Sequence, residues 1–337
     1  MNFAFVKETP SVFIVCSPFQ ILCAIEAIHE FKISEYKFIL CLIEDIRNQQ
    51  VFNLMQKFNL QYEIVWLQNL GKKDLIETFG PKKYAFHRAF LGDIDSIWLN
   101  LVAIRYLARN SDIVYIDDGT RVIPYLKGQS KITHNKLFYI YSCVRKIKNI
   151  RDKGFFFTLF SDVADKKFLC KTNNFNNITK LLSKNGNNKN VYIIGTNINI
   201  YCQKLKYGQN DYKNNLENLF KYIKKAYPSD KLFYIQHGRD QNTYVEEFCR
   251  KYGFEFIRPK ITVELLMVDL PDAPYAIYAY TSTALFTLKK MFPSTLVYNV
   301  LCKRTEDSFY DIYLETSKYF EKHGVDIVEQ QYIDNNA

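Results

Sequence analysis

The sequence contains no run of about 18 uncharged apolar residues, the length that a membrane-spanning helix needs. It also shows no signal-peptide pattern, because Lys7, Glu8 and Pro10 stand before the first apolar run. We therefore expect a cytoplasmic protein, whose membrane contact, if it has any, is peripheral and on the inner face.

Metal-type cysteine spacing is missing as well. The eight cysteines include no Cys-x-x-Cys pair, and most stand singly within apolar runs. We expect them to be reduced core residues, as is usual for cytoplasmic proteins.

Acidic residues are fewer than basic ones, 35 against 45, which gives a net charge of +10. This excess favours an anionic partner, such as nucleic acid, a phosphate-bearing substrate or an acidic membrane surface, without choosing among them. A hydrophobic content of 48% with 24% charged residues is typical of a globular protein. At 337 residues the chain is longer than one core usually grows, so two domains are predicted.

Strand and helix patterns alternate along the first half, as in a parallel sheet covered by helices. Ser17 is a good N-cap and Pro18 fits the first turn of a helix, so a strand, a tight turn and a helix are predicted there. Further strands are predicted at residues 37–43, 62–67 and 113–116, with helices at 48–58 and 96–109. Residues 68–90 are expected to be a connection.

An Asn-rich stretch, residues 172–190, is predicted to link this half to a second α/β series. The second series has predicted strands at 191–194, 232–235, 254–257, 275–280 and 295–300, and predicted helices at 214–226, 242–252, 262–267 and 284–291. The predicted domains are residues 1–180 and 190–310, followed by a C-terminal helix and tail, 311–337. Two Rossmann-like domains with an active site in the cleft between them form the architecture called GT-B.

One predicted strand ends abruptly in Asp117, Asp118 and Gly119. Ligands of open α/β sheets bind beyond such strand ends. Gly119 permits a tight turn, so the carboxylates can point into a cleft. The same residues are also favoured in ordinary surface turns, and the rest of the chain must decide between the two interpretations.

Two further strand ends carry polar residues. Gln236, His237, Gly238 and Arg239 follow one strand, and Thr281, Ser282 and Thr283 follow another and open a helix. A helix N-terminus with hydroxyl side chains binds phosphate, and a histidine can offset charge on a leaving group. A carboxylate facing them can take a proton from an attacking hydroxyl. Taken singly, each motif is also explained by helix capping or loop capping.

Taken together, these motifs resemble the bacterial sialyltransferases of the lipooligosaccharide sialyltransferase and polysialyltransferase type. That group carries an Asp/Glu-Asp-Gly motif, a His-Pro motif and a Ser/Thr-rich motif in this order. The resemblance also includes Cys16-Ser17-Pro18-Phe19-Gln20 and the segment from Ala284 to Val300.

The resemblance implies an inverting, metal-independent enzyme that moves sialic acid from CMP-sialic acid to a hydroxyl, such as that of galactose, of a bacterial surface glycan. O-antigen, capsule and lipooligosaccharide are candidate acceptors, and the acceptor could be lipid-linked. By the same resemblance, Asp117 or Asp118 is the base and His237 contacts the donor phosphate. Residues expected around the donor are Gly119, Gly195, Thr196, Asn197, Gly238, Arg239, Glu264, Thr281, Ser282 and Thr283, with Glu264 on the cytidine ribose, and Ser17 and Gln20 are expected to contact substrate.

The sequence departs from the group at two positions. His237 is followed by Gly238 instead of proline, which leaves the loop less constrained. The turn at Gly195 has no carboxylate, whereas the lipooligosaccharide branch carries its base there. We therefore assign the base to the Asp117–Asp118 pair. If both aspartates lie in one cleft, repulsion between the two carboxylates is expected to raise one pKa.

Three alternatives remain open. The Asp93-Ile94-Asp95 spelling matches the Asp-x-Asp of metal-dependent transferases, although Asp95 and Ser96 are interpreted as helix caps with no strand leading into them. A GT-B enzyme for another nucleotide sugar has the same fold. A non-catalytic module for anionic glycans or nucleic acid would suit the positive charge, although no nucleic-acid motif is present.

Residues 131–151 form a basic, aromatic stretch that suits a lipid headgroup layer or an ordinary amphipathic helix.

Overall fold

The computed structural model describes residues 9–69, 86–129, 143, 146–147, 154–181, 189–302 and 308–337. The chain divides into two compact units, Met1–Asn177 and Ile178–Ala337. The basic stretch predicted at residues 131–151 lies almost wholly outside the described residues.

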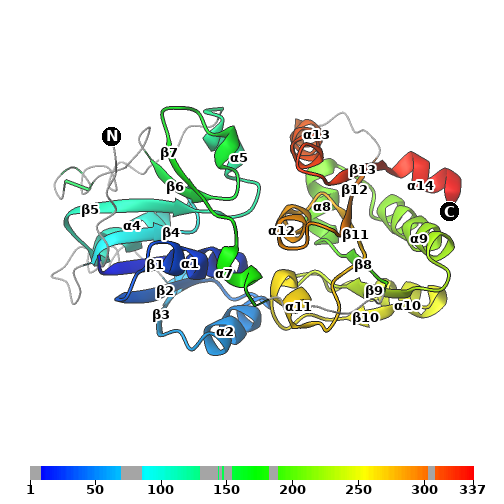
Figure 1. Ribbon diagram of the computed structural model, residues 1–337, viewed down its shortest axis with the longest axis horizontal. Helices are drawn as coiled ribbons and strands as arrows, with labels where there is room; N and C mark the ends of the chain where they lie inside the picture. The colour runs from blue at the N-terminus through cyan, green and yellow to red at the C-terminus, as the bar shows by residue number, and fades with distance from the viewer. Residues whose placement is uncertain are drawn as a thin grey trace. The chain divides into compact units, whose positions relative to one another are not determined.

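The first unit is built on a seven-stranded parallel sheet in the order β3-β2-β1-β4-β5-β6-β7 (Figure 1). Its strands are β1 (Ser11–Val15), β2 (Tyr36–Leu42), β3 (Tyr62–Trp66), β4 (Phe86–Leu91), β5 (Leu107–Ile116), β6 (Phe155–Thr158) and β7 (Leu169–Thr172). Its helices are α1 (Pro18–Glu30), α2 (Asn48–Lys57), α4 (Ile97–Tyr106), α5 (Ile123–Leu126) and α7 (Asn176–Thr179), with 3-10 turns η1 (Leu67–Asn69) and η3 (Ser161–Val163).

The second unit has a six-stranded parallel sheet in the order β10-β9-β8-β11-β12-β13. Its strands are β8 (Asn190–Ile194), β9 (Lys231–Ile235), β10 (Glu255–Ile257), β11 (Ala276–Tyr280), β12 (Leu296–Leu301) and β13 (Asp326–Glu329). Its helices are α8 (Ile198–Leu205), α9 (Gln209–Ala226), α10 (Tyr244–Tyr252), α11 (Val263–Asp269), α12 (Thr283–Met291), α13 (Ser308–Glu321) and α14 (Gln330–Asn336). In Figure 1, α9, α10 and α14 cover one face of this sheet, and α11 and α12 lie on the other.

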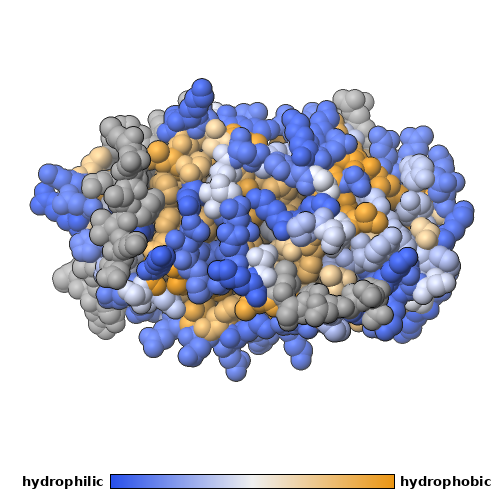
Figure 2. All heavy atoms as spheres, viewed as in Figure 1, coloured by the Kyte–Doolittle hydropathy of each residue, from blue (hydrophilic) through white to orange (hydrophobic). Residues whose placement is uncertain are grey.

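Both sheets have the strand order of a Rossmann domain, with the first strand at the centre and the chain crossing over to the fourth. The predicted α/β class with two Rossmann-like domains is confirmed. Strands β1 and β8 are wholly buried, as expected for central parallel strands covered on both faces. On the face seen in Figure 2, hydrophilic residues cover most of the surface and apolar residues show in separate patches.

Several elements differ from the sequence predictions. All of strand β4 except its last residue lies in the predicted connection at 68–90, and β6, β7 and α8 were not predicted. The segment predicted as a C-terminal helix and tail, 311–337, includes β13, which pairs in parallel with β12 and completes the second sheet.

No helix in the described part of the chain is long and apolar enough to cross a lipid bilayer.

Candidate functional site

Strands β1, β4 and β5 are neighbours in the first sheet, so their carboxyl ends meet at one edge. The topological switch point, where open α/β sheets bind ligands, lies between β1 and β4. The residues that follow these strands are Cys16 and Ser17 after β1, Gly92 and Asp93 after β4, and Asp117 and Asp118 after β5.

The side chains of the adjacent residues Asp117 and Asp118 contact different parts of the first unit. Asp117 is fully buried, and its Oδ1 and Oδ2 accept hydrogen bonds from the Thr158 hydroxyl at 2.5 Å and the Leu159 N–H at 2.7 Å. Its carboxylate therefore ties β5 to the end of β6. Because Asp117 is fully buried and bonded within the core, the condition that both aspartates lie in one cleft is not met.

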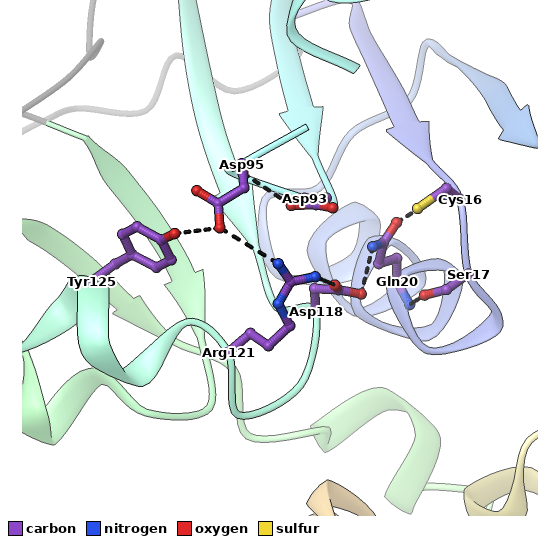
Figure 3. Close-up of polar contacts among 8 residues, drawn as sticks. All are labelled: Cys16, Ser17, Gln20, Asp93, Asp95, Asp118, Arg121 and Tyr125. Atoms are coloured by element: carbon purple, nitrogen blue, oxygen red, sulfur yellow. Dashed lines mark hydrogen bonds and ion pairs between the residues drawn. The ribbon is translucent and has the colours of Figure 1, made fainter. Parts of the chain in front are cut away.

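Asp118 faces the turn after β1 and stays partly exposed (Figure 3). Its Oδ1 accepts a hydrogen bond from Gln20 Nε2 at 2.7 Å, and its Oδ2 lies 3.7 Å from Arg121 Nη1. Burial, and then the charge of Asp93, raise the pKa of Asp118 above its ordinary value, while Gln20, Arg121 and Arg47 act to lower it. A raised pKa brings a carboxylate closer to the range of a general base. The neighbouring charge that raises this pKa is that of Asp93, whereas the sequence had suggested Asp117.

Gly119 has φ +74°, a conformation that favours glycine, so the predicted tight turn after Asp118 is confirmed.

A small pocket opens beside Asp118, with Asp93, Asp95, Arg121 and Tyr125 in its wall. Arg121 Nη2 lies 3.6 Å from Asp95 Oδ2, to which the Tyr125 hydroxyl also donates a hydrogen bond (Figure 3). Within the described ranges, no group of three or more His, Cys, Asp or Glu side chains could hold a metal ion.

The Asp-x-Asp segment is placed differently from the prediction. Strand β4 ends at Leu91 and leads directly to Asp93, so the view that no strand precedes it is wrong. Ser96 is the N-cap of α4, as predicted, and its hydroxyl accepts from the Leu99 N–H. Asp95 is not a cap, because its carboxylate pairs with Arg121.

The two predicted substrate contacts, Ser17 and Gln20, are used inside the protein. Ser17 is the N-cap of α1 and accepts a hydrogen bond from the Gln20 N–H at 3.3 Å. Gln20 is 0% exposed, and its side chain is bonded at both ends.

In the second sheet β9, β8 and β11 are neighbours, and the switch point lies between β8 and β11. The predicted donor residues Gly195, Thr196 and Asn197 follow β8. A Cβ on Gly195 would lie 2.4 Å from Tyr234 Oη and 3.1 Å from the His237 N, so this position allows the β8 and β9 ends to approach closely. Asn197 is the N-cap of α8, and its Oδ1 accepts from the Ile200 N–H.

The His237 loop follows β9. His237 Nδ1 accepts a hydrogen bond from the Arg239 N–H at 3.2 Å, so a neutral imidazole carries its proton on Nε2. His237, Gly238 and Arg239 are all partly exposed. Asp240, which follows this loop, is buried, and its Oδ1 accepts a hydrogen bond from the Asn242 side-chain amide.

The Thr281-Ser282-Thr283 motif follows β11 and begins α12, as predicted. Ser282 is the N-cap, with its hydroxyl accepting from the Ala284 N–H at 3.3 Å. Thr281 Oγ1 lies 3.5 Å from Ser317 Oγ. All three residues are partly exposed. The structure therefore gathers the three predicted motifs of this unit on adjacent strand ends.

Glu264 lies in the first turn of α11 and is 4% exposed. The Thr287 hydroxyl donates to its Oε1 at 3.0 Å, which links α11 to α12. Burial raises the pKa of Glu264, against the hydrogen bonds from Thr287 and Thr262. A direct bond from this buried side chain to a ribose stays a prediction.

Sequence reasoning missed Arg121 and Asp240, and it discounted Asp93. The position of Asp93, two residues beyond a strand that neighbours β1, could have indicated that it lies at the site. That strand contains Arg88 and was not predicted, so the sequence did not place Asp93 at a strand end.

No model of a known protein family matches the sequence, and no curated protein matches it. A 2,6-sialyltransferase from Photobacterium sp. JT-ISH-224, solved with CMP and lactose, is 14% identical with a TM-score of 0.55, covering 95% of this chain and 78% of that one. An α/β-galactoside α-2,3-sialyltransferase from Photobacterium phosphoreum is 12% identical with a TM-score of 0.52, covering 95% and 98%. A UDP-N-acetylglucosamine 2-epimerase is 10% identical with a TM-score of 0.51, covering 98% and 86%. At these identities the likeness shows the fold alone: the chain has the GT-B fold of two Rossmann-like domains.

Proposed function

We propose that the chain is an inverting sialyltransferase that moves sialic acid from CMP-sialic acid to a glycan hydroxyl. The observation that carries this proposal is the gathering of reactive polar groups at the carboxyl edge of each sheet, where Rossmann-like units bind their ligands. One edge offers phosphate-binding groups and the other a carboxylate beside a pocket.

In this proposal the second unit binds the donor. The N-terminus of α12, with the hydroxyls of Thr281, Ser282 and Thr283, binds the phosphate. His237 donates from Nε2 to the same phosphate and offsets the charge that develops as CMP leaves. No metal is required in this scheme, because hydrogen-bond donors balance that charge.

Asp118 is the proposed general base. It accepts the proton of the acceptor hydroxyl while that oxygen forms a bond to the anomeric carbon of sialic acid. The bond from this carbon to the phosphate oxygen breaks, CMP takes the electron pair, and the configuration inverts. Asp118 is preferred to Asp117 because it is partly exposed beside the pocket, whereas both oxygens of Asp117 are bonded within the core.

The choice of donor is supported by the sequence motifs and by the fold shared with two sialyltransferases, one of them solved with CMP and lactose. A bacterial surface glycan ending in galactose is the proposed acceptor class. A second candidate is an enzyme for a UDP-sugar, which the fold shared with UDP-N-acetylglucosamine 2-epimerase favours.

The first test is incubation with CMP-sialic acid and a galactose-terminated acceptor in EDTA, followed by mass spectrometry. We expect sialylated product from the wild type and a loss of about 10²-fold or more in turnover for His237→Ala. A parallel panel of UDP-sugars separates the two candidates. Turnover of a UDP-sugar with none of CMP-sialic acid would reject the proposed donor.

A further inference from the structure

Gln20 joins two distant parts of the first unit. It lies in the first turn of α1, is fully buried, and accepts a hydrogen bond from the Cys16 N–H through Oε1 at 2.7 Å. Its Nε2 donates to Oδ1 of Asp118, 98 residues away, also at 2.7 Å (Figure 3). The side-chain amide therefore bridges the end of β1 to the carboxylate that follows β5.

This arrangement needs an amide. A glutamine presents an acceptor and a donor side by side, and here the acceptor meets an N–H and the donor meets a carboxylate. A glutamate would set two carboxylates against each other, and a leucine would leave the Cys16 N–H and Asp118 Oδ1 without these partners.

The neighbouring strand leaves room for the bridge. A Cβ on Gly92, the residue after β4, would lie 2.1 Å from Gln20 Oε1 and 2.3 Å from its Cδ. Any side chain at this position would push the amide out of place. The ends of β1, β4 and β5 thus each contribute one part: the glutamine, the space for it, and the carboxylate that it holds.

We propose that Gln20 is a positioning residue that fixes the carboxylate of Asp118, so that Oδ2 is the oxygen presented to the acceptor hydroxyl. The inference rests on the proposed function, in which Asp118 is the base. With Oδ1 held by Gln20, Oδ2 lies on the side of Arg121, whose guanidinium borders the pocket. A carboxylate held in one orientation needs no reorganisation when the acceptor arrives.

The first experiment compares Gln20→Leu with the wild type in donor turnover. We expect kcat to fall about 10- to 100-fold through misplacement of the base, while the KM for the donor is unchanged. Gln330→Leu is the matched control, because Gln330 is also fully buried and bonded at both ends, to the Tyr280 hydroxyl and the Asn215 carbonyl. It should lose comparable stability with little change in kcat.

Gln20→Glu gives a readout that loss of packing would not produce. The groups that act on Asp118 are Asp93 after β4, Arg121 after β5, Arg47 before α2 and Gln20 itself, and Cys16 lies beside them. An added carboxylate at position 20 disfavours the charged form of Asp118, so the acid limb of the pH–rate profile should move to higher pH. An unmoved limb with normal kcat would contradict the positioning role.

Gly92→Ala tests the same idea while leaving both hydrogen-bonded residues, Gln20 and Asp118, unsubstituted. Its methyl group displaces the Gln20 amide, so it should reproduce the fall in kcat seen for Gln20→Leu. Wild-type kcat in a folded Gly92→Ala protein would count against the bridge.

An NMR titration decides the bridge independently of turnover. The side-chain amide signal of Gln20 should shift as Asp118 is protonated, and the shift should vanish in Asp118→Asn. If no nucleotide sugar is turned over but the signal titrates, the proposed function fails and the bridge stands. If Asp118→Asn abolishes turnover while Gln20→Leu keeps wild-type kcat and the signal does not titrate, the inference fails and the proposed function stands.

Discussion

Asp117 and Asp118 show how two identical neighbours acquire different roles at a strand end. Successive residues of a strand point to opposite sides, and Gly119 then turns the chain away. Asp117 is directed to the end of β6, where Thr158 and Leu159 satisfy both of its oxygens. Asp118 is directed to the β1–α1 turn, where one oxygen stays beside the pocket. Burial and neighbours, and not residue type, distinguish a structural carboxylate from a candidate base.

This division predicts opposite outcomes for two conservative changes. Asp118→Asn should fold normally and lose about 10²-fold or more in kcat, because an amide cannot accept the acceptor's proton. Asp117→Asn should lower the free energy of unfolding by about 1–3 kcal/mol, because its NH2 group would face the Leu159 N–H or the Thr158 hydroxyl. Urea unfolding and steady-state kinetics on both variants check this. Equal kinetic losses in two equally stable variants would contradict the assignment of the base.

Asp93 offers a second test at the scale of single residues. Its charge raises the pKa of Asp118, and Arg121 lowers it. Asp93→Asn should therefore move the acid limb of the kcat/KM profile to lower pH, and Arg121→Gln should move it to higher pH. Asp165→Asn is the control that should leave the acid limb unmoved. Asp165 lies on another loop, where its carboxylate accepts a hydrogen bond from the Lys167 N–H. Shifts of the same sign in both variants would mean that another group sets the limb.

At the scale of elements, the sequence predicted most strands that have continuous apolar runs, although it missed β6, and it also missed β4 and β13, which have no such run. Strand β4 carries a buried arginine, Arg88, and β13 is a short edge strand bounded by Asp326 and Glu329, so neither has the apolar run of a central strand. The motifs after β5, β9 and β11 were predictable because they follow clear strands. The contact of Gln20 with Asp118 was not, since it depends on which strands are neighbours and how each side chain turns.

Glu264 links two elements through a buried carboxyl and gives a stability prediction. Its pKa in the folded protein lies above the ordinary 4.5, so the folded state holds this proton more tightly than the unfolded state. Its contribution to stability is therefore fully present below about pH 4.5 and is lost as the pH rises through the folded pKa. Glu264→Gln should remove this loss and flatten the dependence of unfolding free energy on pH in that range.

Glu217 is a control of opposite sign. Hydrogen bonds from Lys251 and Tyr252 lower its pKa, so its contribution is present above its ordinary value and is lost as the pH falls through the folded pKa. Chemical denaturation across the acid range should give curves that change in opposite directions for Glu264→Gln and Glu217→Gln. A parallel change would contradict the pKa directions.

At the scale of the whole molecule, the fold limits the chemistry without choosing it. The same fold occurs in sialyltransferases and in an epimerase. In this chain, the polar groups at the carboxyl edge of one sheet differ from those at the carboxyl edge of the other. The first unit carries carboxylates and Arg121, and the second carries hydroxyls, a histidine and a helix N-terminus. In the proposed function, the second unit binds the nucleotide and the first unit supplies the base.

This division predicts that donor binding and turnover can be separated by mutation. Asp118→Asn should bind CMP with an affinity close to that of the wild type, because each unit has its own sheet and core and Asp118 is not in the unit proposed to bind the nucleotide. His237→Ala and Thr281→Ala with Ser282→Ala should weaken CMP binding, by about 1.5–3 kcal/mol for each charge-assisted hydrogen bond lost. Calorimetric titration with CMP measures both. A large loss of CMP affinity in a folded Asp118→Asn protein would mean that the first unit also binds the nucleotide. Unchanged CMP affinity in both second-unit variants would mean that the donor does not bind at the ends of β9 and β11.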